Sequence, residues 1–307
     1  MKKTSALCLS LLIGWASALY SQGAPAVPTS PDPTELAEKT GREQLQKITG
    51  SLKYQHGEIS IRNGLATIRV PAEFSYLGPE DAQTVITKIW GNPASSGRPL
   101  GMLVPSSVGV ADAEGWAVII QYEEDGYISD KDAAKIDYND LLKDMKQSVS
   151  EGNAERAKQG YAPIELVGWA TPPRYDAATK KMYWAKELKF GDYPEPTLNY
   201  NIRMLGRRGV LTLNAVASMS QLAAIEKAAP DILAMVEFKQ GNRYADFDPS
   251  SDKVATYGLA ALITGGVLAK AGFFKALLVG ALAAKKFIII GLIAMGGYLK
   301  KFLGKKE

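Results

Sequence analysis

Few side chains in this sequence suit nucleophilic or metal chemistry, because the chain has one cysteine and one histidine. Cys8 lies inside an N-terminal apolar run, and His56 lies between two short stretches typical of strands. This composition excludes a Cys-His nucleophile pair, a zinc finger, a disulfide framework and a two-histidine metal site. A Ser-His-Asp triad would have to use His56, which the pattern instead predicts to be an exposed residue at a strand end.

Ionisable side chains on two predicted strands are the candidates for a site without histidine. Lys186 and Glu187 lie in MYWAKELKF, and Tyr200 and Arg203 lie in LNYNIRML. Convergence of these groups on one sheet face would form an acid/base or binding site, although spacing alone does not show that they converge. The sequence contains no phosphate-binding glycine loop, nucleophile elbow or zinc motif. It therefore assigns no catalytic residue and no cofactor, and it favours a role other than catalysis.

Two turns present further candidate binding residues. LGRRG places Arg207 and Arg208 at a predicted hairpin tip, where their guanidinium groups suit a carboxylate or phosphate partner. GWATPPRYD predicts a stiff loop with Arg174, Tyr175 and Asp176 at its edge. Such a loop suits a recognition surface. The alternatives are a solvated turn for the arginine pair and a brace within a hairpin for the loop.

Two acidic clusters could supply oxygen ligands to a hard cation. They are EEDGYISDKD at residues 123–132 and RYADFDPSSDK at residues 243–253. The first cluster lacks the ligand spacing of an EF-hand. Its acidic residues are better explained by a turn that is followed by a capped helix. The second is better explained as a polar linker with aspartates that form turns. The sequence therefore predicts no metal site.

The elements that must position these side chains are helices and strands in mixed order. Periodicity predicts helices at 34–48, 79–90, 138–158 and 219–236, and strands at 116–122, 164–170, 182–190, 198–205 and 210–217. Asn63-Gly64 predicts a hairpin turn, and Ser129 and Asp137 are predicted helix caps. Short connections favour antiparallel pairing. The predicted fold class is α+β, mainly an antiparallel sheet covered by helices, followed by a C-terminal transmembrane helix or helices.

Both ends of the chain indicate export and a membrane. Residues 1–23 have the charged start, apolar stretch and small residues of a signal peptide, with an uncleaved anchor helix as the alternative. Residues 24–33 form a proline-rich linker, residues 34–253 the exported α+β domain, and residues 254–307 a glycine-rich anchor with a lysine-rich end. The domains are predicted with these bounds.

The anchor is predicted from an apolar run at residues 257–274, whose only charge is Lys270. Eighteen helical residues extend about 27 Å, close to the hydrocarbon thickness of a bilayer. Ala261, Gly265 and Ala269 begin a stripe of small residues that favours close helix packing in lipid. A surface-lying amphipathic helix and a soluble core helix are the alternatives. One crossing fits most simply, and the number of crossings stays open.

Charge is distributed unevenly along the chain and predicts its orientation. Residues 255–307 contain eight lysines and one glutamate, a net charge of +7, whereas residues 24–253 have a net charge of −5. Lysine-rich flanks stay in the cytoplasm. We therefore expect a protein of the bacterial cytoplasmic membrane, with its body on the periplasmic side and its C-terminus inside. An acidic body lacks the basic stripe of a nucleic-acid binder.

Several stretches resemble the bacterial family known as domain of unknown function 2167. They are DGYISDKDAAKIDYNDLLKDM, GWATPPRYD, MYWAKEL, LNYNIRMLGRRGVLTLN and FKQGNRYADFDPSSDKVATYGLAALITGG. The resemblance extends from about Lys53 to the C-terminus. It implies a membrane-anchored protein and no particular activity. The element order is also similar to that of PsbP-like and Mog1-like binding domains, which is a similarity of fold only.

Two functional hypotheses follow. The first is a membrane-anchored envelope protein that serves as a protein-interaction or assembly module, with the lipid bilayer and an envelope membrane protein, or a second copy contacting its small-residue helix faces, as partners. The second is an envelope enzyme or small-ligand-binding protein that uses a Lys/Glu/Tyr/Arg site. A pocket joining Lys186, Glu187 and Arg203 would favour the second hypothesis.

Overall fold

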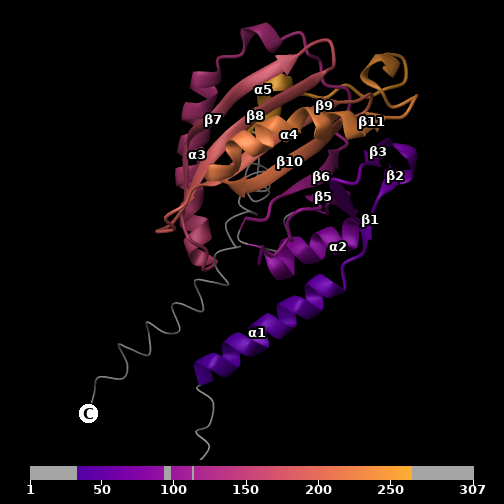
Figure 1. Cartoon of the computed structure of the whole chain (residues 1–307). Helices are drawn as coiled ribbons and strands as arrows, with labels where there is room; N and C mark the ends of the chain where they lie inside the picture. Colours follow the sequence, from indigo (N-terminus) through magenta and orange to yellow (C-terminus); the bar gives the residue numbers. More distant parts are fainter. Residues whose placement is uncertain (1–32, 93–97, 113, 265–307) are drawn as a thin grey trace, which may run out of the picture.

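The computed structural model of this chain describes residues 33–92, 98–112 and 114–264, with only the backbone described for residues 33–38. Its strands form two antiparallel sheets (Figure 1). The eight-stranded sheet has the order β1 (Tyr54–Gln55), β4 (Phe74–Leu77), β5 (Gly101–Pro105), β6 (Ala117–Glu123), β10 (Val210–Ser218), β9 (Thr197–Leu205), β8 (Lys181–Phe190) and β7 (Ile164–Asp176). The three-stranded sheet has the order β11 (Val236–Phe238), β3 (Ala66–Val70) and β2 (Gly57–Ile61).

The hairpin between β2 and β3 turns at the residues that the sequence predicts. Arg62, Asn63 and Gly64 have φ angles of 46°, 53° and 84°. Positive φ is tolerated best by glycine and asparagine, which explains their place in this turn. Strand pairing resumes directly after it, with Ile61 opposite Ala66.

One face of the large sheet is covered by α4 (Leu222–Met235) and by the small sheet (Figure 1). Apolar residues of β9 and β10, including Leu198, Ile202 and Leu213, pack here against Ile225 and Ile232 of α4. Side chains alternate between the two faces of a strand, so each central strand gives every second residue to this core. The face is apolar throughout the central strands.

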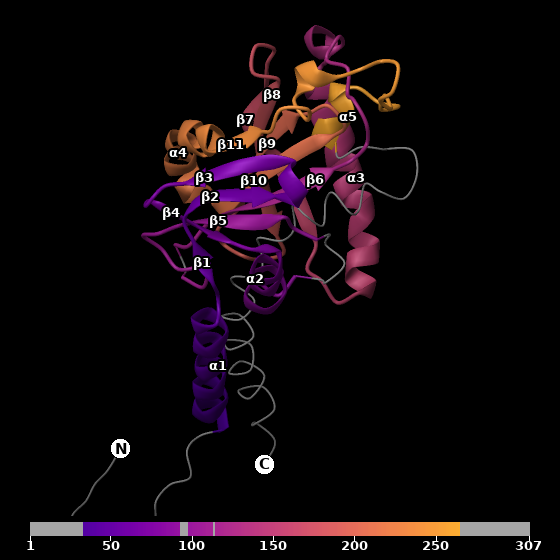
Figure 2. The ribbon, with the colours of Figure 1, turned by 90° about the vertical axis from the view of Figure 1, so that its right-hand side faces the viewer.

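The opposite face holds two separate apolar clusters. The first joins β7 and β8 to α3 (Tyr138–Lys158) and α5 (Leu259–Thr264), and the second joins β4, β5 and β6 to α2 (Pro79–Thr84). The carboxylate of Asp137 caps α3 by accepting hydrogen bonds from the backbone amides of Asn139 and Asp140, at 2.9 and 3.2 Å. The helix predicted at residues 138–158 is thereby confirmed. Figure 2 shows α1 (Pro33–Gly50) projecting below the body.

The prediction of a loop at GWATPPRYD is wrong. Strand β7 continues through Pro172 and Pro173 to Asp176, with shifts of register against β8. Proline cannot donate a backbone hydrogen bond, but β7 is the edge strand and its outer side needs no donor. Ser129 does not cap a helix, since its hydroxyl accepts only a 3.4 Å contact from the amide of Lys131.

The α+β fold class and the antiparallel sheet are confirmed. Within the described residues no helix is both long and apolar enough to cross a bilayer. Residues 259–264, which the sequence assigns to the anchor, form α5, and its Leu259, Leu262 and Ile263 are buried in the cluster with α3. The predicted signal peptide, and the predicted anchor after Thr264, lie outside the described residues.

Candidate functional site

Polar side chains gather on the central strands of the large sheet, on the face that α2 and α3 flank. We call this set the polar row; it consists of Lys186 on β8, of Asn199, Asn201 and Arg203 on β9, and of Thr212 and Asn214 on β10. Strand register places them side by side, because Lys186 lies opposite Asn199, Asn201 opposite Asn214, and Arg203 opposite Thr212. The row separates the two apolar clusters of this face.

Every member of the polar row is buried. Lys186 and Arg203 are each 8% exposed, and Asn214 and Thr212 are each 1% exposed. The sequence predicts the alternation of polar and apolar residues on β9 but not the burial of the polar ones. The alternation in LNYNIRML predicts a strand with a polar and an apolar face, yet every residue of β9 is buried. Buried polar groups cost free energy unless they form hydrogen bonds.

The hydrogen bonds within the row are incomplete. Arg203 donates from Nη1 to the hydroxyl of Thr212, and the Asn201 amide donates to the backbone oxygen and Oδ1 of Asn199, at 3.0 and 2.9 Å. Among the residues that the structure describes, four buried side-chain atoms find no partner. They are Nε of Arg203, Nε1 of Trp184, and Nδ2 and Oδ1 of Asn214. The Trp184 ring lies beside the row, with its centroid 5.7 Å from Cζ of Arg203.

The row carries an excess of positive charge. Burial, with the nearby Arg203 guanidinium as a second cause, lowers the pKa of Lys186 from 10.5 to about 8. Burial also lowers the pKa of Arg203, while the Glu123 carboxylate opposes that shift. Glu123 lies 3.8 Å from Nη1 of Arg203 and is 43% exposed, so solvent weakens this ion pair. Two buried cations thus have one partly solvated carboxylate beside them.

The structure brings together only part of the predicted Lys/Glu/Tyr/Arg site. Glu187 follows Lys186 in β8 and lies opposite Leu198, so its side chain is on the other face of the sheet. Tyr200 also faces the core under α4. A pocket that joins Lys186, Glu187 and Arg203 is therefore ruled out, and Lys186 and Arg203 remain on one face, at the two ends of the polar row.

Arg207 and Arg208 contact another part of the same chain. Residues 241–258, here called the clasp, run along the end of the large sheet where β9 turns into β10. Asp252 in the clasp accepts hydrogen bonds from Nε of Arg207 at 2.6 Å and from Nε of Arg208 at 3.3 Å. Its side chain is 2% exposed. The Arg207 guanidinium, together with the backbone amide of Asp248, lowers the pKa of Asp252 to about 2.

Tyr175 takes part in a second contact of the clasp. Its hydroxyl and the Lys180 ammonium both donate to Oδ2 of Asp130 at 2.7 Å, and Tyr244 of the clasp donates to Oδ1 at 3.2 Å. Burial would raise the pKa of Asp130, but these hydrogen bonds outweigh burial and lower it. Tyr127 stacks on Tyr244, with ring centroids 4.5 Å apart. The Asp130 carboxylate therefore accepts hydrogen bonds from three side chains, one of them in the clasp.

Arg174 and Asp176 contact residues of their own hairpin. Cζ of Arg174 lies 4.5 Å from the ring centroid of Tyr183 on β8. Asp176 accepts hydrogen bonds from the backbone amide of Ala178 at 2.9 Å and from the hydroxyl of Thr179 at 2.8 Å. These local contacts lower the pKa of Asp176, the Thr179 hydroxyl first among them. Both side chains brace the turn between β7 and β8.

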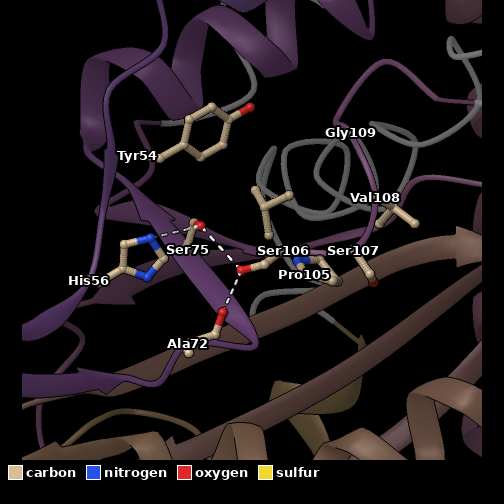
Figure 3. Close-up of a pocket in the computed structure, with 10 residues that line it drawn as sticks. Tyr54, His56, Ala72, Ser75, Pro105, Ser106, Ser107, Val108 and Gly109 are labelled. Atoms are coloured by element: carbon tan, nitrogen blue, oxygen red, sulfur yellow. Dashed lines mark hydrogen bonds between the residues drawn. The ribbon is translucent and has the colours of Figure 1, made fainter.

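His56 lines a surface cavity of about 530 Å³ between β1, β4 and the end of β5 (Figure 3). Its Nε2 lies 3.4 Å from the hydroxyl of Ser75, which lies 3.5 Å from the hydroxyl of Ser106. Ser106 in turn donates to the backbone oxygen of Ala72 at 2.8 Å. In the described part of the chain no carboxylate hydrogen-bonds to His56, so the group lacks the third member of a triad. The sequence contains no signal that joins these three residues.

The acidic clusters do not form a cation site within the described residues, where no three acidic, cysteine or histidine side chains come together. Their carboxylates are used in other ways. Asp125 accepts a hydrogen bond from Tyr257, and Asp130 and Asp252 accept the hydrogen bonds described above. The chemistry available at the polar row is binding by buried hydrogen-bond donors.

A family model described as "Protein of unknown function (DUF2167)" matches residues 53–296. No curated protein matches the sequence. Two solved structures show low similarity. The solution structure of cyanobacterial PsbP (CyanoP) from Synechocystis sp. PCC 6803 is 11% identical and has a TM-score of 0.34, over 62% of this chain and 93% of that chain. The Ran-binding protein Mog1p of Saccharomyces cerevisiae is 12% identical and has a TM-score of 0.31, over 64% and 100%. Scores this low support no inference about function.

Proposed function

The chain belongs to the DUF2167 family, whose name supplies no activity, and we propose a function from its own residues. It is a membrane-anchored protein of the bacterial envelope, and its exported α+β domain is a module that binds or assembles other envelope proteins. The charged and apolar N-terminus and the lysine-rich apolar C-terminus support this location.

One structural observation carries the proposal: the folded body is fixed to the segment that leads into the apolar tail. The clasp is bound to the body through Asp252, Tyr244 and Tyr257, and α5 follows it directly. Leu259, Leu262 and Ile263 of α5 are buried in the same cluster as residues of α3 and β8. A flexible linker would let the body turn freely over the membrane, whereas a segment bound to the body up to Thr264 supports a restricted orientation.

A fixed orientation suits assembly, because it presents the same surface to every neighbour in the membrane plane. In this proposal the membrane segment begins after Thr264, since the preceding residues belong to the body. The net charge of −5 on residues 24–253 and of +7 on residues 255–307 supports an arrangement with the body outside and the lysine-rich end inside. The small residues of the tail sequence suit close contact with a second membrane helix.

The test is chemical cross-linking of the full chain in native membranes, followed by identification of the adducts. We expect a specific envelope protein, or a second copy, to be captured with the wild type. Asp252→Ala releases the clasp and should change or abolish the adduct, whereas Asp231→Ala removes an exposed carboxylate of α4 and should leave it intact. Extraction of the chain by a salt wash, or digestion of its last lysines from outside intact spheroplasts, would contradict the proposal.

A small-ligand-binding function is the second candidate, and the polar row favours it. Of its predicted residues, Lys186 and Arg203 lie on the same face of neighbouring strands, four residues apart in register, while Glu187 lies on the other face. The row therefore supports binding by positive charge and hydrogen-bond donors. It provides no acid/base pair.

A further inference from the structure

The polar row combines buried positive charges with buried hydrogen-bonding atoms that lack partners, a combination that is rare in protein interiors. Its cations are buried, and several of its hydrogen-bonding atoms have no partner among the described residues. Most buried polar groups in folded proteins are paired, so four such atoms on adjacent strands require an explanation. They are not scattered, since Trp184 precedes Lys186 by two residues on the same face of β8, and Arg203 and Asn214 lie on the next two strands.

Packing alone does not explain the row. On either side of it the same sheet face carries Met182 and Leu188 in one apolar cluster, and Ile119 and Val216 in the other. Apolar residues on β9 would join these clusters into one core at a lower cost in free energy. The strand instead gives this face Asn199, Asn201 and Arg203 in succession.

The chemistry of the row is that of an anion receptor. The Lys186 ammonium is buried, and the charge that acts on it most strongly after burial is the like charge of Arg203. The unpartnered Nε of Arg203 belongs to the side-on edge with which a guanidinium group binds an oxyanion. Trp184 adds a neutral N–H donor, and the free amide of Asn214 adds a donor and an acceptor. The nearest carboxylate to Arg203, that of Glu123, is partly solvated.

We propose that the polar row binds the oxyanion group, carboxylate or phosphate, of a small organic ligand. Lys186 and the Nε edge of Arg203 hold the negative charge, and Trp184 and Asn214 form hydrogen bonds to the rest of the ligand. The ligand would supply the acceptors that this part of the described structure lacks. This inference rests on the second candidate function, for which it names the ligand class, and it is independent of the proposed assembly function.

The experiment measures the thermal unfolding of the full chain in detergent, followed by tryptophan fluorescence. Sodium phosphate and sodium succinate are compared with sodium chloride at equal ionic strength. We expect one or both oxyanions to raise Tm by about 4 °C at saturating concentration. A rise with phosphate alone identifies a phosphoryl ligand, and a rise with succinate alone identifies a carboxylate ligand.

Three variants locate the effect. Lys186→Met should abolish the rise in Tm. Arg203→Lys keeps the charge but lacks the side-on edge, and it should need about tenfold more anion for the same rise. Lys189→Met removes an exposed lysine from the same strand and should respond as the wild type does. The absence of a rise with both anions, or an equal rise in wild type and Lys186→Met, would overturn the proposal.

Discussion

The clasp and the polar row are both rich in charged residues, but they differ in how these charges are paired. In the clasp, Asp252 faces two arginines, and Asp130 of the body accepts hydrogen bonds from three side chains, one of them Tyr244 of the clasp. In the polar row, Lys186 and Arg203 are buried beside unpartnered donors. Charges that satisfy one another hold a fold together, whereas buried charges without partners cost stability and leave capacity for a ligand.

This difference separates the predicted binding residues into those that form contacts within the chain and those that remain available to a ligand. Arg207 and Tyr175 are predicted as binding residues, and in the structure both contact carboxylates of the same chain. Lys186 and Arg203 are predicted together with Glu187, and they are the pair that lacks buried carboxylate partners. Residue type alone therefore does not distinguish a brace from a receptor.

The largest expected effect is a gain of stability on removing a charge from the polar row. The pKa of Lys186 falls from 10.5 to about 8 on folding, so keeping it charged costs about 3 kcal/mol at pH 7. Lys186→Met should therefore raise the free energy of unfolding by roughly this amount, as measured by urea denaturation. Lys189→Met should leave it nearly unchanged, and a loss of stability in Lys186→Met would show that the ammonium is paired.

The same substitution predicts a dependence on pH. The pKa of Lys186 is lower in the folded than in the unfolded chain, so its cost is complete below pH 8 and disappears as the pH rises towards 10.5. The difference in unfolding free energy between wild type and Lys186→Met should shrink over this window. A constant difference between pH 7 and pH 10.5 would indicate that the gain comes from packing and that no lysine is neutralised.

A smaller effect of opposite sign is expected at the clasp. Asp130→Ala removes the acceptor of Lys180, Tyr175 and Tyr244, and it should destabilise the fold by about 2 kcal/mol. The matched control is Asp140→Ala, which removes an exposed carboxylate in the first turn of α3. Equal unfolding free energies for Asp130→Ala and wild type would mean that the clasp does not stabilise the body.

Acid should weaken the contact between Asp252 and the arginine pair. The pKa of Asp252 is lowered from 3.8 to about 2, so its contribution is present above pH 4 and is lost as the pH falls through 2. The wild type should lose stability over this range relative to Asp252→Asn, whose side chain does not titrate. Parallel curves for the two proteins in urea between pH 2 and pH 5 would contradict this pairing.

The smallest effect is expected at Arg208, the more exposed of the two arginines that contact Asp252. The Arg208 side chain is 52% exposed and lies 3.3 Å from Asp252, so Arg208→Ala should cost about 0.5 kcal/mol. Arg207→Ala should cost more, because that side chain is 19% exposed and its contact is 2.6 Å long. The reverse order in urea denaturation would show that exposure does not rank these two contacts.

Local signals in the sequence account for most of the fold. The helix at residues 138–158 is predicted because a capping aspartate and apolar residues at helical spacing act within a few residues of one another. The strands β8, β9 and β10 are predicted from alternation in the same way. Short strands such as β1 and β4 are missed, since two to four residues carry too little pattern.

Strand alternation in the sequence already separates two members of the predicted Lys/Glu/Tyr/Arg site. Adjacent residues of a strand point to opposite faces, so Lys186 and Glu187 cannot share a site on one face of β8. Tyr200 and Arg203 are three residues apart on β9, so they also point to opposite faces of the sheet. The run Asn199, Asn201, Arg203 marks one polar face of β9, and the burial of that face depends on the elements that pack over it.

The sequence by itself determined the strands and helices, their alternating faces and the apolar and charged character of the two ends, because each of these depends on neighbours along the chain. The tertiary structure alone decided that the polar face of β9 is buried, that Asp252 reaches Arg207, and that α5 packs against α3. Burial and pairing depend on which distant segments meet. A period of two residues says which side chains share a face, but only the packing of other elements decides whether that face contacts water.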